Sequence, residues 1–223
     1  MMQSLAIFDL DHTLLDGDSD ALWCAFLIDE GVLDGASFGP RNAETERGYR
    51  AGSISTQAFC DFYIGTLAGR TSAQWQPLRQ RFVDERVLPR IKPGTAALLR
   101  RHRQQGDLLM LSTATNRFIT EPTASALGFE HLIGTDCETD GQGRFTGRTR
   151  GTPNMRAGKI ENLSAWLAAR GQTIGGLTVS FYSDSMNDLP LLEAAQQPVA
   201  VDPEPALRAL ATARGWPIVS LLS

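Results

Sequence analysis

Residues 7–15, IFDLDHTLL, place the carboxylates of Asp9 and Asp11 directly after a short apolar run. That run, residues 5–8, has the length and composition of a buried strand, so the two acids are expected at the end of a strand. Like charges this close repel, and an apolar setting makes each harder to ionise. Such an arrangement is costly unless something positive joins it. The stretch therefore points to a cation at the end of a strand.

The size and composition of the chain fit a globular protein. Its 223 residues, 42% of them hydrophobic, suffice for one large domain or a core with one sizeable insertion. The net charge of −4, with no basic face, argues against a nucleic-acid partner. No apolar run reaches membrane-spanning length, and the first residues lack the basic start of a leader, so we expect a cytoplasmic protein without membrane association. The three scattered cysteines suggest neither a disulfide framework nor a zinc site.

Two kinds of pattern divide the chain. In residues 19–90 apolar side chains recur at helical spacing with no strong strand pattern between them, which predicts a helical insertion. From residue 91 onward strand-like runs alternate with helix-like segments, which is typical of a parallel sheet covered on both faces. The expected strands are residues 107–113, 131–135, 177–183, 198–201 and 216–221, with a hairpin over residues 137–151. We therefore predict an α/β fold, a doubly wound parallel sheet with an inserted helical cap: residues 1–16 and 91–223 form the core, and residues 17–90 form the cap.

Polar residues gather where these strands end. In an open parallel sheet, ligands bind at the carboxyl ends of the strands. This rule selects four carboxylates, two hydroxyls and an ammonium, namely Asp9, Asp11, Ser112, Thr113, Lys159, Asp184 and Asp188. Several acids with little else to neutralise them indicate a hard divalent cation, and Mg²⁺ usually shares its oxygen ligands with a phosphate. The set predicts a site for Mg²⁺ and a phosphate, whose remaining oxygens would bind the ammonium and a hydroxyl.

The two leading acids suggest a division of roles. One carboxylate could attack phosphorus and form an aspartyl phosphate, an established form of covalent catalysis. The other could protonate the leaving alcohol and then activate water. Each residue alone also has an ordinary structural explanation, such as a helix cap at Thr113 or a solvated helix position at Lys159. Their occurrence together, in one order and at the strand ends, favours catalysis.

These residues resemble the four motifs of the haloacid dehalogenase-like (HAD) hydrolases. The matching features are FDLDHTLL, the hydroxyl after LLML, Lys159, and YSDSMNDLPLLE. The match spans nearly the whole chain, and the helical insertion is similar to the cap of the phosphoserine phosphatase-like branch. The resemblance implies a Mg²⁺-dependent phosphomonoesterase of small phosphorylated metabolites that works through an aspartyl-phosphate intermediate.

The resemblance also implies a role for each matching position. Asp9 would be the nucleophile and a Mg²⁺ ligand, and Asp11 would be the general acid/base and would bind Mg²⁺ through its backbone carbonyl. The transferring phosphoryl group would be bound by Thr113, which aligns better than Ser112, although the choice is close. Lys159 would stabilise charge on the phosphoryl oxygens and on Asp9. Asp184 would be a side-chain metal ligand, with Asn187 and Asp188 completing the metal and phosphate surroundings.

One departure from the family bears on the substrate. Phosphoserine phosphatases carry a Glu shortly after the first motif, where it meets the amino group of the substrate. Here Asp18 stands nearest that position and is shorter by one methylene. A substrate amine remains compatible with Asp18, and histidinol phosphate suits the pattern at least as well as phosphoserine. The sequence does not indicate an oligomeric state.

Other functions can be weighed against the same residues. A signalling receiver domain also carries phosphate on Asp, but its lysine comes last, whereas Lys159 precedes Asp184. A non-catalytic binding module should have lost a motif residue, and none is missing. A dehalogenase would leave Asp11 and Asp184 idle. A phosphotransferase that passes phosphate to an alcohol acceptor remains an open alternative.

Overall fold

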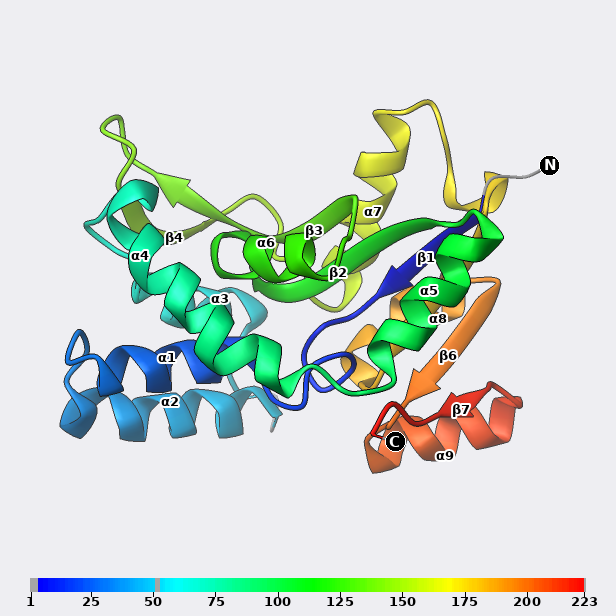
Figure 1. The fold of residues 1–223 in the computed structure, drawn as a ribbon, viewed down its shortest axis with the longest axis horizontal. Coiled ribbons are helices and arrows are strands. Elements are labelled where there is room, and N and C mark those ends of the chain that lie inside the picture. The colour runs from blue at the N-terminus through cyan, green and yellow to red at the C-terminus, as the bar shows by residue number, and fades with distance from the viewer. Residues whose placement is uncertain (1–3, 51–52, 223) are drawn as a thin grey trace.

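The computed structural model describes residues 4–50 and 53–222 and contains one seven-stranded sheet, shown in Figure 1. The sheet order is β4-β3-β2-β1-β5-β6-β7. The strands are β1 Ser4–Phe8, β2 Leu108–Asn116, β3 His131–Thr139, β4 Phe145–Arg150, β5 Thr178–Ser183, β6 Gln197–Val201 and β7 Ile218–Val219. Neighbouring strands are parallel except for β3 and β4, which form the expected hairpin. The first strand therefore lies in the middle of the sheet, and its end faces the ends of β2 and β5.

Helices cover both faces of the sheet, which confirms the doubly wound α/β fold. The helices after the insertion are α5 Thr95–Gln105, α6 Arg117–Ala126, α7 Ala157–Ala168, α8 Leu189–Ala194 and α9 Pro205–Arg214. Side chains of β1 alternate between the two faces, as a strand requires. Ala6 and Phe8 belong to the core that contains α5 and α6, whereas Leu5 and Ile7 belong to the core that contains α7, α8 and α9.

The segment between β1 and α5 is helical, as its apolar spacing predicts. It contains α1 Ser19–Asp29, α2 Gly35–Arg50, α3 Thr56–Gly65 and α4 Ser72–Phe82, followed by a π-helical turn at Val83–Val87 and a 3₁₀ turn at Leu88–Arg90. Side-chain caps begin three of these helices: Asp18 caps α1, Ser55 caps α3, and Thr71 forms a capping box with Gln74 at α4. The caps supply acceptors for backbone N–H groups that have no partner inside a helix.

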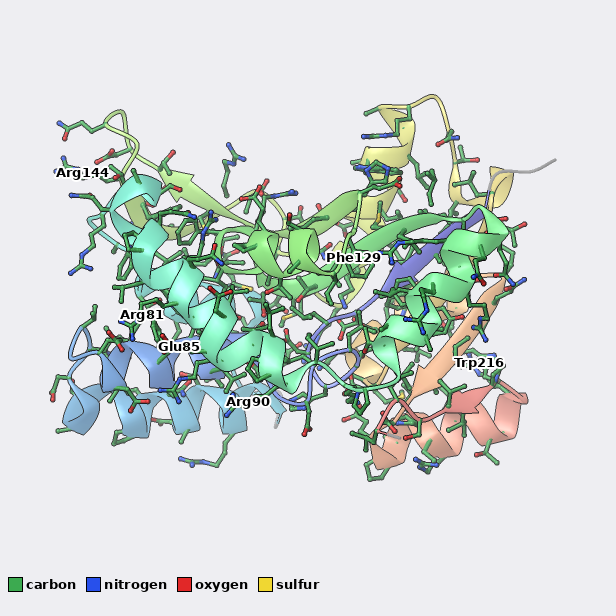
Figure 2. All side chains as sticks on the ribbon, viewed as in Figure 1. Arg81, Glu85, Arg90, Phe129, Arg144 and Trp216 are labelled. Atoms are coloured by element: carbon green, nitrogen blue, oxygen red, sulfur yellow. The ribbon has the colours of Figure 1, made fainter. Side chains whose placement is uncertain are left out.

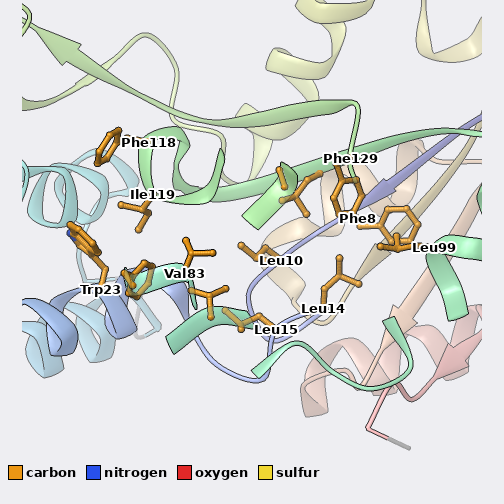
Figure 3. Packing of buried hydrophobic residues seen from close by; sticks show 14 of the residues in the cluster. Phe8, Leu10, Leu14, Leu15, Trp23, Val83, Leu99, Phe118, Ile119 and Phe129 are labelled. Carbon is orange, nitrogen blue, oxygen red and sulfur yellow. The ribbon is translucent and has the colours of Figure 1, made fainter. Parts of the chain in front are cut away.

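One hydrophobic cluster joins the helical segment to the sheet. Figure 3 shows it running from Trp23 and Val83 through Leu10 and Leu15 to Phe8. These side chains are at most 1% exposed. The structure thus packs the insertion firmly on one side of the sheet, and the division into a core and a cap domain stays a prediction.

The β3–β4 hairpin also packs against the helical segment. Gly69 N–H donates to the Phe145 carbonyl at 2.9 Å, and Phe145 N–H donates to the Arg70 carbonyl at 2.9 Å. Gly147 in β4 has a φ of +84°, and a Cβ there would lie 3.2 Å from the Ala68 Cβ. Glycine is therefore required at residue 147 by both backbone conformation and close approach.

Charged side chains lie mainly on the outside of the helical segment. Figure 2 shows Arg81 of α4 next to Glu85 of the π-helical turn that follows α4. Arg81 donates to Glu30 at 2.7 Å and to Glu85 at 3.0 Å while half of its side chain stays exposed. Within residues 4–50 and 53–222, no helix combines the length and the apolar character needed to cross a bilayer.

Candidate active site

The site is built around a buried ion-pair group at the end of β1. Asp9 follows β1, and its N–H donates to the Tyr182 carbonyl of β5 at 3.0 Å. This bond holds Asp9 at the carboxyl ends of the central strands. Lys159 from α7 donates to Asp9 Oδ1 and to Asp188 Oδ2, both at 2.7 Å. Asp9 is 7% exposed and Lys159 is 2% exposed. One ammonium thus neutralises part of two buried carboxylates.

Thr13 links this group to Asp184, which follows β5. Its Oγ1 lies 3.1 Å from Asp9 Oδ2 and 2.9 Å from Asp184 Oδ1, and it accepts the Asp184 N–H at 3.1 Å. A hydroxyl carries one hydrogen, so Thr13 can donate to only one of these two carboxylates at a time. The carboxylate oxygen that does not receive this hydrogen, on Asp9 or on Asp184, is therefore a place for a proton or a cation. Sequence reasoning gave Thr13 no role, although it lies four residues after Asp9 in the same loop.

The protonation of these groups follows from burial and from an excess of acids. Burial raises the pKa of Asp9 well above its ordinary value, with Lys159 opposing the rise and the neighbouring acids adding to it. Burial also raises the pKa of Asp184 to about 6. Burial alone would lower the pKa of Lys159, but Asp188 and Asp9 outweigh it and raise that pKa. Lys159 is therefore charged, and the acids around it exceed the positive charge available.

Asp11 faces a different set of donors from Asp9. Its Oδ1 accepts the Ser19 N–H at the start of α1 at 2.7 Å. Its Oδ2 accepts from Thr115 Oγ1 at 2.9 Å and lies 3.3 Å from Thr113 Oγ1. Asp11 therefore connects the end of β2 with the first turn of the helical segment. Thr115 had no role in the sequence interpretation, although side chains two residues apart in a strand share a side.

The two candidate hydroxyls at the end of β2 point in different directions. Ser112 Oγ is bonded by Asn154 Nδ2 at 3.1 Å, and the same amide donates to the Thr113 carbonyl at 3.0 Å. Thr113 Oγ1, in contrast, lies by Asp11 and accepts the Thr115 N–H at 3.2 Å. The structure thus brings Thr113 beside the acids and places Ser112 against the buried Asn154.

Residues 183–188, at the end of β5, border the site on the side opposite to β2. Asp188 Oδ2 accepts from Ser183 Oγ at 2.7 Å in addition to Lys159. Asn187 Oδ1 accepts from Arg156 Nε at 3.2 Å. Glu204 holds the loop from behind, because its carboxylate accepts the Met186 N–H at 2.6 Å.

The loop after β1 is anchored by the second lysine of the chain. Lys92 Nζ donates to the His12 carbonyl at 2.5 Å and to Asp202 Oδ2 at 2.9 Å. His12 and Asp202 both have positive φ, 57° and 41°, which is uncommon for residues other than glycine. Lys92 therefore holds the strained backbone of His12 and the side chain of Asp202 next to the acids.

A cavity of about 390 Å³ opens between these strand ends and the helical segment. Its lining includes the predicted residues Asp9, Asp11, Asp18, Lys159, Asp184, Asn187 and Asp188. Asp18 caps α1 by accepting the Ala21 N–H at 2.9 Å and at the same time borders the cavity. Ser112 and Thr113 are absent from the described lining, whereas Ala114 and Thr115 of the same strand are part of it.

Two of the four acids at the site, Asp9 and Asp184, are suited to bind a metal ion. Among the described residues, no group of three or more His, Cys, Asp or Glu side chains is arranged to hold a metal ion by itself. The carboxylates of Asp11 and Asp188 each accept at least two hydrogen bonds from protein donors. Asp9 and Asp184 share the single hydroxyl of Thr13 and have raised pKa values. Mg²⁺ is usually bound by one or two carboxylates, with waters and substrate oxygens completing its shell. Asp9 and Asp184 could supply these two carboxylates.

Known proteins are similar to this chain over nearly its full length. The family model described as haloacid dehalogenase-like hydrolase matches residues 6–193. A histidinol-phosphatase of Neisseria meningitidis is 39% identical over 220 residues, which cover 98% of this chain and 99% of the relative. A phosphoserine phosphatase of Mycobacterium tuberculosis is 30% identical over 97% of this chain and 70% of its own length.

Solved structures show the same fold. A protein of unknown function from Bordetella pertussis superimposes with a TM-score of 0.94 and 40% identity, over 99% of this chain and all of its own. A substrate-bound phosphoserine phosphatase superimposes with a TM-score of 0.68 at 14% identity, over 99% of this chain and 94% of its own. The second likeness concerns the fold alone.

Proposed function

The chain belongs to the haloacid dehalogenase-like hydrolases and is a phosphatase, and we propose that it hydrolyses a small phosphomonoester with a positively charged organic part through an aspartyl phosphate on Asp9. The observation that carries the proposal is the buried contact between Asp9 and Lys159 at 2.7 Å, at the base of an acid-lined cavity. A buried carboxylate held by a fixed ammonium is oriented for attack on a bound phosphate. Lys159 would then stabilise the negative charge that spreads over the phosphoryl oxygens.

The reaction takes two steps on this chain's residues. In the first, an Asp9 oxygen bonds to phosphorus, the bond from phosphorus to the ester oxygen breaks, and Asp11 gives its proton to the leaving alkoxide. In the second, Asp11 takes a proton from water, whose oxygen attacks phosphorus and frees the Asp9 carboxylate and inorganic phosphate. Asp11 can serve both steps because Ser19 and Thr115 fix its carboxylate between the two walls of the cavity.

The surplus of acid fits a Mg²⁺ ion. Asp9 and Asp184 would hold it with their carboxylates, and Asp11 would hold it with its backbone carbonyl. When bound, Mg²⁺ supplies positive charge to the acids and to the phosphoryl group. Thr13 would keep the two ligand carboxylates in place, since its hydroxyl contacts both.

The charge of the cavity favours a substrate whose organic part is positive. Lining the cavity are eight carboxylates, Asp9, Asp11, Asp18, Asp20, Asp184, Asp188, Asp202 and Glu204, and one ammonium, Lys159. A substrate carboxylate, as in phosphoserine, would meet like charge here and lose affinity. An amino alcohol phosphate without a carboxylate would not, and its ammonium would be attracted to Asp18, which borders the cavity. Similarity to a histidinol-phosphatase over nearly the full length of both chains supports histidinol phosphate as the substrate.

The test is phosphate release from histidinol phosphate, phosphoserine and 2-aminoethyl phosphate, with Mg²⁺ and with a chelator. We expect kcat/KM to be highest for histidinol phosphate, activity to be lost reversibly on chelation, and Asp9→Asn to be inactive while folded. Turnover of phosphoserine at an equal or higher kcat/KM would contradict the substrate assignment. Activity in folded Asp9→Asn would contradict the assignment of the nucleophile.

A further inference from the structure

The cap-side end of the cavity has a chemistry of its own. Asp20 of α1 and Tyr49 of α2 line it, at 4% and 7% exposure, together with the apolar side chains of Phe59, Met155 and Ala114. We call these five residues the ring pocket. Neither Asp20 nor Tyr49 contributes to the phosphoryl-transfer steps derived above. Two nearly buried polar groups facing a cavity between apolar walls indicate a ligand group that is mainly apolar but carries hydrogen-bonding atoms.

The carboxylate of Asp20 is poorly matched inside the protein. Its described hydrogen bond, from Asn116 Nδ2, is long at 3.4 Å. The Thr115 hydroxyl also lies beside Asp20, but its single hydrogen must serve Asp11 as well, with which it makes a contact of 2.9 Å. Burial raises the pKa of Asp20 well above its ordinary value, Asp18 and Asp11 add to the rise, and hydrogen bonding to Thr115 and Asn116 opposes only part of it. A carboxylate kept in such a place is stabilised when a ligand brings an N–H donor or a positive charge.

The hydroxyl of Tyr49 is the second unmatched group. Among the residues that the structure describes, it has no hydrogen-bond partner of good geometry, and the charged Arg156 guanidinium beside it opposes only part of the rise in pKa that burial causes. Its ring is held firmly, because it packs against Phe59 with centroids 4.4 Å apart and lies under the Arg156 guanidinium at 4.9 Å. A buried hydroxyl that a rigid ring presents to a cavity can both donate and accept a hydrogen bond.

We propose that Asp20 and Tyr49 bind an imidazole-type ring of the substrate, with one ring nitrogen donating to Asp20 and the other bonded to the Tyr49 hydroxyl. Phe59 and Met155 would contact the faces of the ring. An imidazole carries two nitrogens in the 1,3-positions of a small flat ring, and each nitrogen would face one of the two protein groups that line this cavity. The match holds whether the ring is neutral or charged, because the Tyr49 hydroxyl can donate to a bare nitrogen or accept from a protonated one.

This inference rests on the proposed function and adds to it. The ammonium and the phosphate of histidinol phosphate are accounted for by Asp18 and by the Asp9–Lys159 group, and the ring pocket accounts for the remaining part of the molecule. The specificity would therefore come from α1 and α2, two elements outside the sheet. A site that hydrogen-bonds a substrate N–H discriminates strongly against analogues that lack it, since its own polar groups are then left unpaired.

The experiment compares two substrates in matched variants. Histidinol phosphate carries the ring, and 2-aminoethyl phosphate keeps the amine and the phosphate without it. Asp20→Asn and Tyr49→Phe keep the side-chain volumes. Asp61→Asn and Tyr63→Phe are controls, because both residues lie on α3 but outside the described lining, bonded to Thr149 and Asn42 respectively. Inhibition by L-histidinol, which lacks phosphate, gives a readout independent of turnover, and the melting temperature of each variant establishes folding.

We expect Asp20→Asn to lower kcat/KM for histidinol phosphate by about 10–100-fold and Tyr49→Phe by about 3–10-fold. The value for 2-aminoethyl phosphate should change by less than about 3-fold, and inhibition by L-histidinol should weaken in parallel. The controls should leave the ratio of the two substrates as in the wild type. Equal losses on both substrates, or unchanged inhibition by L-histidinol, would overturn the ring pocket while leaving the phosphatase assignment intact. A wild-type enzyme that hydrolyses neither substrate would instead refute the proposed function.

Discussion

Replacing Lys159 by methionine tests the electrostatics of the site in the sharpest way. Lys159 is 2% exposed and donates to two carboxylates whose own side chains are 9% and 6% exposed. Methionine fills a similar volume without the charge. Asp9 and Asp188 would then stay buried without a cation, which costs about 3–5 kcal/mol of unfolding free energy. For a chain of this length, the melting temperature should fall by roughly 2–4 °C for each kcal/mol, or about 6–20 °C in all.

The loss should depend on pH in a direction that the structure sets. Burial already raises the pKa of Asp9, and Lys159 opposes that rise, so its removal raises the pKa further. A carboxyl whose pKa is higher in the folded state holds more protons there than in the unfolded state. Its stabilising contribution is complete below the unfolded pKa of about 3.9 and is lost as pH rises through the folded pKa. The difference between wild type and Lys159→Met should therefore be small near pH 4 and grow toward pH 8.

The assay is urea and thermal unfolding between pH 4 and pH 8 in the presence of a chelator. Arg81→Met is the matched control, because Arg81 also pairs with two carboxylates, Glu30 and Glu85, but at the surface. Exposed ion pairs contribute little, so its loss should be much smaller and nearly independent of pH. Adding Asp9→Asn to Lys159→Met should recover part of the stability. A loss in Lys159→Met as small as that in Arg81→Met, or one that does not change with pH, would refute the buried charge cluster.

Three further outcomes follow from the same contacts. Because burial raises the pKa of Asp20, its carboxylate destabilises the fold as pH rises through that pKa. In urea titrations at neutral pH, Asp20→Asn should therefore raise the free energy of unfolding by about 0.5–2 kcal/mol, and a lower free energy would contradict this reasoning. Saturating Mg²⁺, at about 100 times its Kd, should stabilise the wild type by about 2.7 kcal/mol in thermal melts, and Asp184→Asn should lose most of the effect. Gly147→Ala should destabilise by about 1–3 kcal/mol, whereas Gly141→Ala, with open space around it, should not; equal effects would argue against the close packing of β4 on α3.

The positions of most strands along the chain and the gathering of acids at their ends could be predicted from the sequence, because both follow from short local patterns. The run before Asp9 is apolar throughout, as a central parallel strand must be. Gly106 marks the end of α5, and the structure gives it a φ of +78°. The residues placed at strand ends then meet because all parallel strands end on one edge.

Strand ends rich in polar residues were harder to predict. The sequence indicated that the second strand ends at Thr113, but β2 continues to Asn116. Its last residues are buried polar groups that bond within the site, such as Thr115 to Asp11, so they lack the apolar signal by which strands are recognised. The third strand likewise runs to Thr139, beyond the expected end at residue 135, because its second half pairs with β4 rather than with β2.

The residues of the ring pocket could not be identified from the sequence, and the reason is physical. Tyr49 and Phe59 occur at helical spacings that serve equally well for core packing, and only the relative orientation of α1, α2 and α3 brings them to the cavity. Asp20 gives no stronger signal, since an acid in the first turn of a helix is commonly a favourable interaction with the helix dipole. Its near-complete burial distinguishes it, and burial is a property of the assembled fold.

The acids that line the cavity lower the stability of the fold and at the same time attract positively charged ligands. The chain carries a net charge of only −4, yet eight carboxylates and one ammonium border a single cavity. Desolvation and mutual repulsion among these acids destabilise the empty protein, as the raised pKa values of Asp9 and Asp20 show. A bound metal ion and the positively charged amine of a substrate would each offset part of that destabilisation. Ligand binding should therefore stabilise this protein beyond the contacts that the ligands make, and substitutions that neutralise single acids should raise stability while lowering activity.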